Sequence, residues 1–229
     1  MRRSILAACV LAVVLGGCGG ADNTANTTNT IEPRNTASSP SPEASDDNSG
    51  GCSLLTARER RSIAGKGLSI VAPSQAAKDT VECRWVDDLS SPAPTALRVV
   101  TTPAQKWVLR LPDQIENTIS AGRVEPEYTK RLLAARKRVF EGADKIGDEE
   151  ACGMFSLLIE ANTGNKNVRE IVLYEPAEAG GVTAIVQSCS KGVHTLLTYH
   201  EIGLAPSKPL ADAMVRMVSI AHKRAIALW

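Results

Sequence analysis

The chain has 229 residues, of which 43% are hydrophobic and 3% aromatic, and its formal net charge at pH 7 is +1. A charge balance so near neutral gives no support to a nucleic-acid-binding role, which requires a strongly basic domain. The scarcity of aromatic residues predicts a core built mainly from aliphatic side chains.

The first seventeen residues have the pattern of an export signal. Two arginines precede an apolar run over residues 5–15, which is followed by two glycines and Cys18. A charged start, a short apolar stretch and small residues at a cleavage site are typical of a signal peptide. The run is shorter than the roughly 20 residues that a membrane-spanning helix needs. We therefore predict that residues 1–17 are removed on export.

The segment Leu15-Gly16-Gly17-Cys18 resembles the lipobox of bacterial lipoproteins. In that family the cysteine thiol is diacylated, the bond before it is cut, and the new amino group is often acylated too. The resemblance implies acyl chains such as palmitate on Cys18, and two or more such chains anchor a protein stably to a bilayer. It implies a location in the cell envelope, on the periplasmic side of an outer membrane or the outer face of the cytoplasmic membrane. The alternative is a plain secretory signal with a chance cysteine.

Residues 18–51 are predicted to be the lipidated cysteine and a disordered tether. Between residues 19 and 51 the only large aliphatic side chain is Ile31. Such a stretch cannot bury enough apolar surface to offset the entropy lost on ordering. Residues 52–229 are predicted to form a globular extracytoplasmic domain, which carries 23 basic and 20 acidic side chains.

Four cysteines lie within the predicted domain. Four thiols allow three connectivities, and disulfides persist in the compartments that exported proteins reach. We favour two bridges that each close a moderate loop within one half of the domain, Cys52–Cys83 and Cys152–Cys189. A metal site is the weaker alternative because the sequence has no CxxC motif or closely spaced Cys/His pair. We predict no metal and no cofactor.

The first half of the domain begins with a capping-box signal, in which Thr56 is followed three residues later by Glu59. This signal predicts a helix over residues 57–65. Strands are expected over 82–87 and 96–102, separated by a turn rich in serine and proline. Further helices are expected over 104–110, 113–121 and 126–141, the last with Pro126 in its first turn.

The second half is predicted to contain four strands and one helix. The strands are expected over 154–161, 168–174, 181–189 and 193–200, with turns between hairpin partners. The helix is expected over 207–226, where apolar residues recur at helical spacing on one face. This order predicts an α+β domain with an antiparallel sheet and with helices packed mainly on one face, stapled by disulfides. Each half supplies a helix, a cysteine pair and paired strands, which raises the hypothesis of two pseudo-repeated halves.

Three short motifs carry a further resemblance. They are Cys52-Ser53-Leu54-Leu55-Thr56, Cys83-Arg84-Trp85 and Ile146-Gly147-Asp148-Glu149-Glu150-Ala151. Together they resemble uncharacterised actinobacterial lipoproteins of the family called domain of unknown function 3558. The second cysteine pair and the Asn/Thr-rich tether depart from that pattern. The resemblance implies a lipid-tethered extracytoplasmic domain and brings no catalytic residues with it.

The sequence contains no signature of a known catalytic site. It lacks the nucleophile elbow, the phosphate-binding loop and the metalloprotease motif. His194 and His200 fall roughly 20 Å apart on one strand, too far to share a metal, and are expected at the surface or a sheet edge. His222 lies within the last predicted helix beside Lys223 and Arg224, where a cation is expected to complement the negative end of the helix dipole.

Two clusters of charge are candidates for a functional role. The acidic residues Asp144, Asp148, Glu149 and Glu150 lack the spacing of a calcium-binding loop, so a solvated loop or a helix start is favoured. A basic set on one helix is a candidate docking face for anionic lipid or an acidic partner, against the alternative of a solvated helix face. It consists of Lys130, Arg131, Arg136, Lys137 and Arg138.

Three classes of function follow from these patterns. The first is a non-enzymatic envelope module that binds a protein, a lipid or a small molecule, with no catalytic residues. The second is an accessory or sensory subunit that docks on a membrane partner through the basic helix. The third is an unrecognised envelope hydrolase, which would require a pocket holding two or more mutually oriented ionisable groups.

Overall fold

Six strands form a single antiparallel sheet in the computed structural model, which describes residues 50–65, 67–72, 79–122, 124–164, 170–177 and 180–229. The described residues belong to one compact unit. The strands are β1 (Ile70–Ala72), β2 (Val81–Val86), β3 (Ala96–Pro103), β4 (Glu170–Pro176), β5 (Val182–Ser190) and β6 (Val193–His200).

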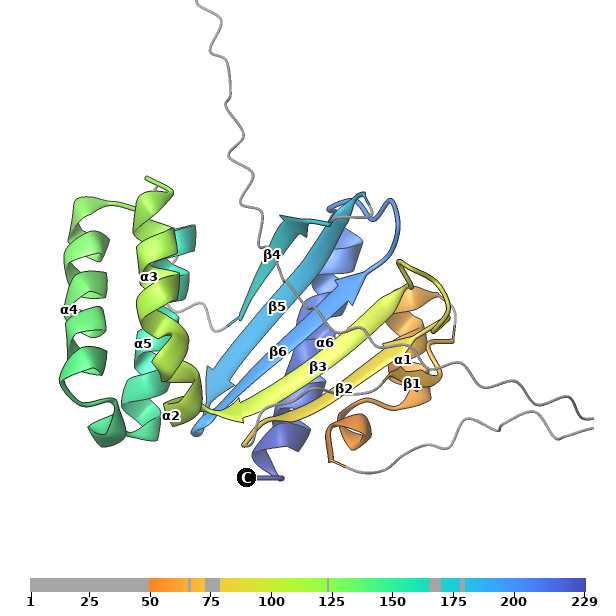
Figure 1. The fold of residues 1–229 in the computed structure, drawn as a ribbon, viewed down its shortest axis with the longest axis horizontal. Coiled ribbons are helices and arrows are strands. Elements are labelled where there is room, and N and C mark those ends of the chain that lie inside the picture. The colour runs from red at the N-terminus through yellow and green to blue at the C-terminus, as the bar shows by residue number, and fades with distance from the viewer. Residues whose placement is uncertain (1–49, 66, 73–78, 123, 165–169, 178–179) are drawn as a thin grey trace, which may run out of the picture. The chain divides into compact units, whose positions relative to one another are not determined.

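The strand order in the sheet is β1-β2-β3-β6-β5-β4, and every pairing is antiparallel. Each half of the chain thus makes a three-stranded meander, and the two meanders join where β3 pairs with β6 in the middle of the sheet (Figure 1). The alternation of side chains along a strand gives the sheet two distinct faces. In β6, for example, Leu197 and Tyr199 are buried on one face, whereas Leu196 and Thr198 are only partly buried on the other.

The long helix α6 (Lys208–Ile226) covers one face of the sheet, together with η1 (Gly50–Leu54) and α1 (Ala57–Ala64). Helix α6 buries Met214, Val218 and Ala221 against Leu97 and Leu197 of the central strands. Their spacing of three and four residues places these side chains on one face of the helix. The helix begins at Ser207, whose side chain accepts a hydrogen bond from the backbone N–H of Leu210.

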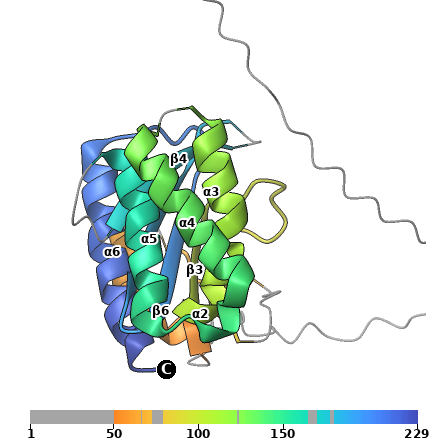
Figure 2. The same ribbon diagram turned by 90° about the vertical axis from the view of Figure 1, so that its left-hand side faces the viewer.

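The remaining helices lie between β3 and β4 in the chain. They are α2 (Ala104–Trp107), η2 (Val108–Arg110), α3 (Leu111–Ser120), α4 (Pro126–Gly142), η3 (Ala143–Lys145) and α5 (Asp148–Thr163). They form a helical insert that packs against the ends of β3, β5 and β6 around its own apolar core (Figure 2). No helix in the described part of the chain is both long enough and apolar enough to cross a bilayer.

One predicted strand is wrong. Residues 154–161 belong to helix α5, not to a strand. Helix α5 lies between α3, α4 and the sheet, so apolar side chains occur on most of its circumference and the sequence shows a nearly continuous apolar run. Periodicity cannot distinguish a short buried strand from a buried helix in such a run.

Both favoured disulfide pairings are confirmed. The Cys52–Cys83 bridge, with a Cα–Cα distance of 5.0 Å, ties η1 to β2. The Cys152–Cys189 bridge, with a Cα–Cα distance of 5.3 Å, ties α5 to β5. The first bridge therefore lies in the core beneath α6, and the second links the helical insert to the sheet.

The predicted α+β class with an antiparallel, disulfide-stapled sheet is confirmed. The two halves correspond in outline, because each disulfide joins a helix ahead of a meander to the middle strand of that meander. They differ in the face of the sheet that they use. Cys83 lies in the core beneath α6, whereas Cys189 lies in the core of the helical insert.

Candidate functional site

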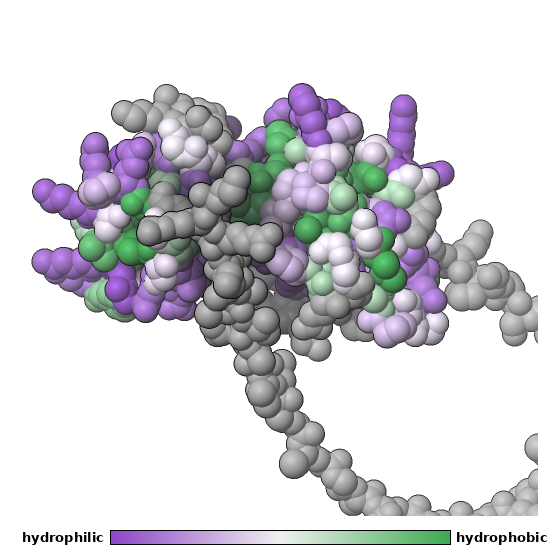
Figure 3. Space-filling model, turned by 90° about the horizontal axis from the view of Figure 1, so that it is seen from above, coloured by the Kyte–Doolittle hydropathy of each residue, from purple (hydrophilic) through white to green (hydrophobic). Residues whose placement is uncertain are grey.

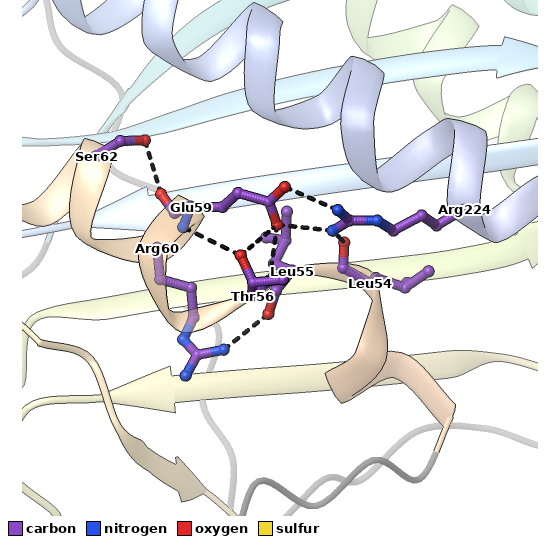
Figure 4. A network of polar contacts seen from close by, with 7 residues as sticks. All are labelled: Leu54, Leu55, Thr56, Glu59, Arg60, Ser62 and Arg224. Carbon is purple, nitrogen blue, oxygen red and sulfur yellow. Dashed lines mark hydrogen bonds and ion pairs between the residues drawn. The ribbon is translucent and has the colours of Figure 1, made fainter.

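The first of the three motifs behind the second resemblance, Cys52 to Thr56, leads into a polar network at the start of the domain that we call the structural staple (Figure 4). Leu54 and Leu55 are fully buried in the core beneath α6. Thr56 begins helix α1, and its backbone N–H and hydroxyl both donate to the Glu59 carboxylate. The predicted capping box is therefore present, and it sets the direction in which α1 leaves η1.

Glu59 also joins this segment to the end of α6. Its two carboxylate oxygens accept hydrogen bonds of 2.7 and 2.8 Å from the Arg224 guanidinium, which donates in addition to the carbonyl of Leu54. The Arg224 hydrogen bond is the main cause that lowers the pKa of Glu59 to about 2. Bidentate pairs of this kind fix geometry as well as charge, so they hold α1 against α6.

Arg60 is a buried cation in the same staple, with 5% of its surface exposed. Its guanidinium donates to the carbonyls of Leu55 and Leu68 and lies 4.8 Å from the ring centre of Trp85. Burying a charge is costly unless it is hydrogen-bonded and paired with other groups. These contacts explain why a basic side chain can be buried at this position without a bound ligand.

His194 lies at the joint between the sheet and the helical insert. Its ring stacks on Trp107 at 5.0 Å between ring centres and meets Phe155 edge-on, and Nε2 is 3.0 Å from the Gln187 side-chain oxygen. Burial is the main cause that lowers the pKa of His194 to about 3, and the positive charge of Arg110 acts in the same direction. The expectation that His194 lies at the surface is therefore wrong, because the insert covers this end of the strand.

His222 is buried beneath the end of α6 and faces two hydroxyl groups. Its Nδ1 is 2.8 Å from Thr195 Oγ1, and its Nε2 is 2.8 Å from Ser190 Oγ. Burial lowers the pKa of His222, so the neutral ring is favoured. The predicted role of a cation at the helix end is wrong, because the side chain points into the core instead of toward the last carbonyls.

These contacts belong to a polar row that crosses the sheet under α6. The row runs over four neighbouring strands through Thr101, Thr195, Ser188 and Glu170. Helix α6 meets it with Ser219, which donates to Glu170 at 2.7 Å, and with His222. Paired polar groups in a core specify one arrangement of the elements that share them. The row therefore determines the position of α6 along the strands.

The Ser190–His222 pair has the separation of a nucleophile and its base but not their electrostatics. A general base must become a cation, and a third group with negative charge normally stabilises that cation. Here the third group is the neutral hydroxyl of Thr195, and burial disfavours the imidazolium form. The pair is better suited to fixing α6 than to activating Ser190.

The predicted basic set lies on α4, and its arginines are engaged within the helical insert. Arg131 lies 3.7 Å from Glu160, and Arg136 lies 3.0 Å from Glu116. Arg138 donates to Glu150 at 2.8 Å. These pairs neutralise much of the charge that the sequence displays, so the basic set is weaker as an electrostatic surface than its composition suggests.

A narrower surface of α4 does face solvent, and we call it the α4 face. It consists of Lys130, Leu133, Lys137 and Phe140, which recur at intervals of three and four residues. Leu133 is 47% exposed and Phe140 69% exposed. Lys137 has a weak contact of 3.5 Å with the neighbouring Glu141. Mixed apolar and basic character at helical spacing fits a contact surface better than a fully solvated face.

Three of the four residues of the acidic cluster lie in the first turn of helix α5. Asp148, Glu149 and Glu150 occupy its first turn, where negative charge complements the helix dipole. Asp144 lies in η3. Within the described ranges no three acidic, histidine or cysteine side chains converge as a metal site would require.

A recess of about 280 Å³ opens at the opposite end of the sheet from the β5–β6 turn. It is lined by the β2–β3 loop and the start of the β6–α6 loop, including Asp87, Asp88, Glu201 and Ile202. Ser90 donates twice to Asp88 and lowers the pKa of that carboxyl, while Tyr199 donates to Glu201. Figure 3, which views the molecule from above, shows apolar and polar residues interspersed on that side of its surface. The recess is acidic and partly apolar, which suits a cationic group more than a lipid chain.

Sequence reasoning missed the polar row and the recess. The sequence does contain a signal for the polar row. Threonine and serine occupy inward-facing positions of β5 and β6, and Ser219 and His222 interrupt the apolar face of α6. The sequence carries no signal for the recess, since the recess forms where two loops distant in the sequence meet.

Comparison with protein-family models, curated proteins and solved structures gave no match for this chain. The resemblance to the two lipoprotein families therefore stays a prediction.

Proposed function

We propose that this protein is a lipoprotein of a bacterial cell envelope, anchored through acylated Cys18, whose domain is a non-enzymatic binding module. The observation that carries the proposal is the lipobox-like segment ahead of a domain with two disulfides. Disulfides indicate an oxidising, extracytoplasmic environment. A signal ending in a cysteine adds an anchor to that location.

The binding role is supported by how the ionisable groups are used. His194, His222 and Arg60 are buried in structural contacts, and Glu59 is bound by Arg224. The described exposed surfaces, such as the α4 face and the acidic recess, have the character of contact surfaces instead of reaction centres. A hydrolase would need a base that can become charged beside an accessible nucleophile, and the Ser190–His222 pair does not provide one.

The anchor is tested by following the fate of Cys18 in cells. We expect the protein to sediment with membranes and to yield an N-terminal peptide that begins with acylated Cys18. Cys18→Ser should abolish both results, because serine offers no thiol for diacylation. Cys9→Ser, within the predicted signal, is the matched control and should leave acylation unchanged. Mass spectrometry that finds an unmodified Cys18 in the mature chain would refute the anchor.

A second candidate is an accessory subunit that docks through the α4 face on an envelope protein with acidic side chains around an apolar hollow. The exposure of Leu133 and Phe140 beside two lysines favours this reading. We expect a photoreactive phenylalanine analogue at position 140 to crosslink to one protein, at a peptide rich in acidic residues. The same probe at position 109 is the matched control, because Leu109 in η2 is 56% exposed and belongs to neither the α4 face nor the recess.

The charge component of that contact can be separated from its apolar component. Lys130→Glu combined with Lys137→Glu should reduce the crosslink about tenfold or more, because two exposed pairs worth up to about 1 kcal/mol each are lost and replaced by like-charge repulsion. Equal crosslinking from both positions, or no effect of the charge reversal, would remove this candidate and leave the anchored binding module in place.

A further inference from the structure

Two large apolar side chains are exposed immediately after helix α6. Leu228 is 48% exposed and Trp229 is 50% exposed. The indole of Trp229 is held in place, since its Nε1 donates to Thr101 Oγ1 at 3.2 Å. A half-exposed tryptophan is well suited to a membrane–water interface, where the apolar ring leaves water and neighbouring groups satisfy the N–H.

Trp229 lies near Gly50, where the predicted tether joins the domain; we call this point the tether exit. Thr101, which binds the indole, pairs with Val81 on the neighbouring strand. Gly50, at the end of the predicted tether, lies against Val81, because a Cβ at Gly50 would be 3.5 Å from Val81 Cγ1. Trp229 and the tether exit therefore contact adjacent strands. Figures 1 and 2 both show η1 and the end of α6 at the same end of the domain.

We infer that Leu228 and Trp229 rest in the membrane–water interface of the bilayer that holds Cys18. This inference rests on the proposed lipidation of Cys18. The tether from Cys18 to Gly50 has a contour length of about 110 Å, so its length alone allows any face of the domain to reach the bilayer. If the tether is a random coil, as its composition predicts, it favours end-to-end distances far below its contour length, roughly 30 Å here. The face beside the tether exit is therefore the one most often presented to the membrane.

The inferred orientation leaves the other surfaces available to ligands. The acidic recess lies at the opposite end of the strands, and α4 lies on the far side of the helical insert (Figure 1). Contact through the end of α6 would thus hold the domain close to the bilayer, with the recess at the end away from it and α4 at the side of the domain. Acidic repulsion from anionic lipid would also keep the recess away from the surface.

Tryptophan fluorescence tests the inference in the full mature chain. Trp85 and Trp107 are 1% and 3% exposed, so Trp229 is the accessible one of the three indoles. The lipidated protein is reconstituted in vesicles of phosphatidylcholine and phosphatidylglycerol that carry brominated acyl chains. We expect a loss of up to about a third of the emission, the share of one indole in three. Trp229→Phe should abolish the quenching by brominated lipid. The emission of the two buried indoles should remain and shows that the variant is folded.

A second pair of variants keeps the fluorophore intact. Leu228→Glu should reduce the quenching at least twofold, because an acidic side chain beside the indole is repelled by phosphatidylglycerol and opposes entry into the interface. Ile202→Glu, at the opposite end of the sheet, is the matched control and should leave the quenching unchanged. If Ile202→Glu reduces it as much as Leu228→Glu does, the proposed orientation is wrong.

The failure of this inference differs from the failure of the anchor. A chain whose mass shows acylated Cys18 but whose emission resists brominated lipid overturns the contact of Trp229 and leaves the anchor standing. A chain with unmodified Cys18 that stays in the supernatant overturns the anchor, and the inference falls with it.

Discussion

Acidification from pH 7 to pH 4 is expected to lower the free energy of unfolding by about 3 kcal/mol through His194 alone. The pKa of His194 is lowered from 6.5 to about 3 in the folded protein. The unfolded chain therefore takes up a proton as the pH falls below 6.5, and the folded chain does not until about pH 3. The contribution of His194 to the free energy of unfolding is fully present above pH 6.5 and is lost progressively as the pH falls from 6.5 to about 3. The lowered pKa of His222 acts in the same direction.

The effect of His194 is isolated by a variant that keeps an aromatic ring but cannot titrate. His194→Phe should flatten the dependence of stability on pH between 6.5 and 4 by about 1.4 kcal/mol per pH unit. Gln187→Leu removes the hydrogen-bond partner and retains the histidine, so it should lower stability without changing that slope. Urea unfolding at a series of pH values measures both. A slope that is the same in His194→Phe and the wild type would contradict the expectation.

Loss of the Cys152–Cys189 bridge is expected to cost about 4 kcal/mol of stability, from the entropy of closing a loop with a sequence separation of 37. The double substitution Cys152→Ser with Cys189→Ser, compared by denaturant unfolding, measures this loss. The bridge also fastens the helical insert to β5. We therefore expect the amides of α3, α4 and α5 to exchange with solvent faster than those of α6.

The other bridge is the matched control for that pattern. Cys52→Ser with Cys83→Ser opens a loop with a separation of 31, so the expected loss of stability is similar. Its exchange pattern should be the reverse, because this bridge lies in the core beneath α6 and ties η1 to β2. Equal acceleration in the insert and in α6 for both double variants would show that the two parts open together and would contradict this assignment.

Local signals predicted much of the secondary structure because the interactions that they describe are local. The capping box of Thr56 and Glu59 is present, and the helix predicted over 126–141 corresponds to α4. The hairpin of β5 and β6 turns at Lys191 and Gly192, as expected. Where the element is surrounded by protein, as α5 is, the apolar pattern loses its period and the prediction fails.

The candidate sites were less predictable than the elements. The basic set on α4 was visible as composition, yet its pairing with Glu116, Glu150 and Glu160 depends on how α3 and α5 pack beside it. The sequence pattern did not single out Leu133 or Phe140 as exposed. Their exposure is decided by the neighbours that cover the other side of the helix.

The sequence by itself predicted the pairing of the four cysteines of the domain, the α+β class and the extent of most elements, since these depend on residue type and on spacing along the chain. Only the tertiary structure decided the burial of His194 and His222, the polar row under α6 and the meeting of Trp229 with the tether exit. Each of these joins residues more than twenty positions apart, and the free energy of such contacts depends on shape and burial that no local pattern encodes.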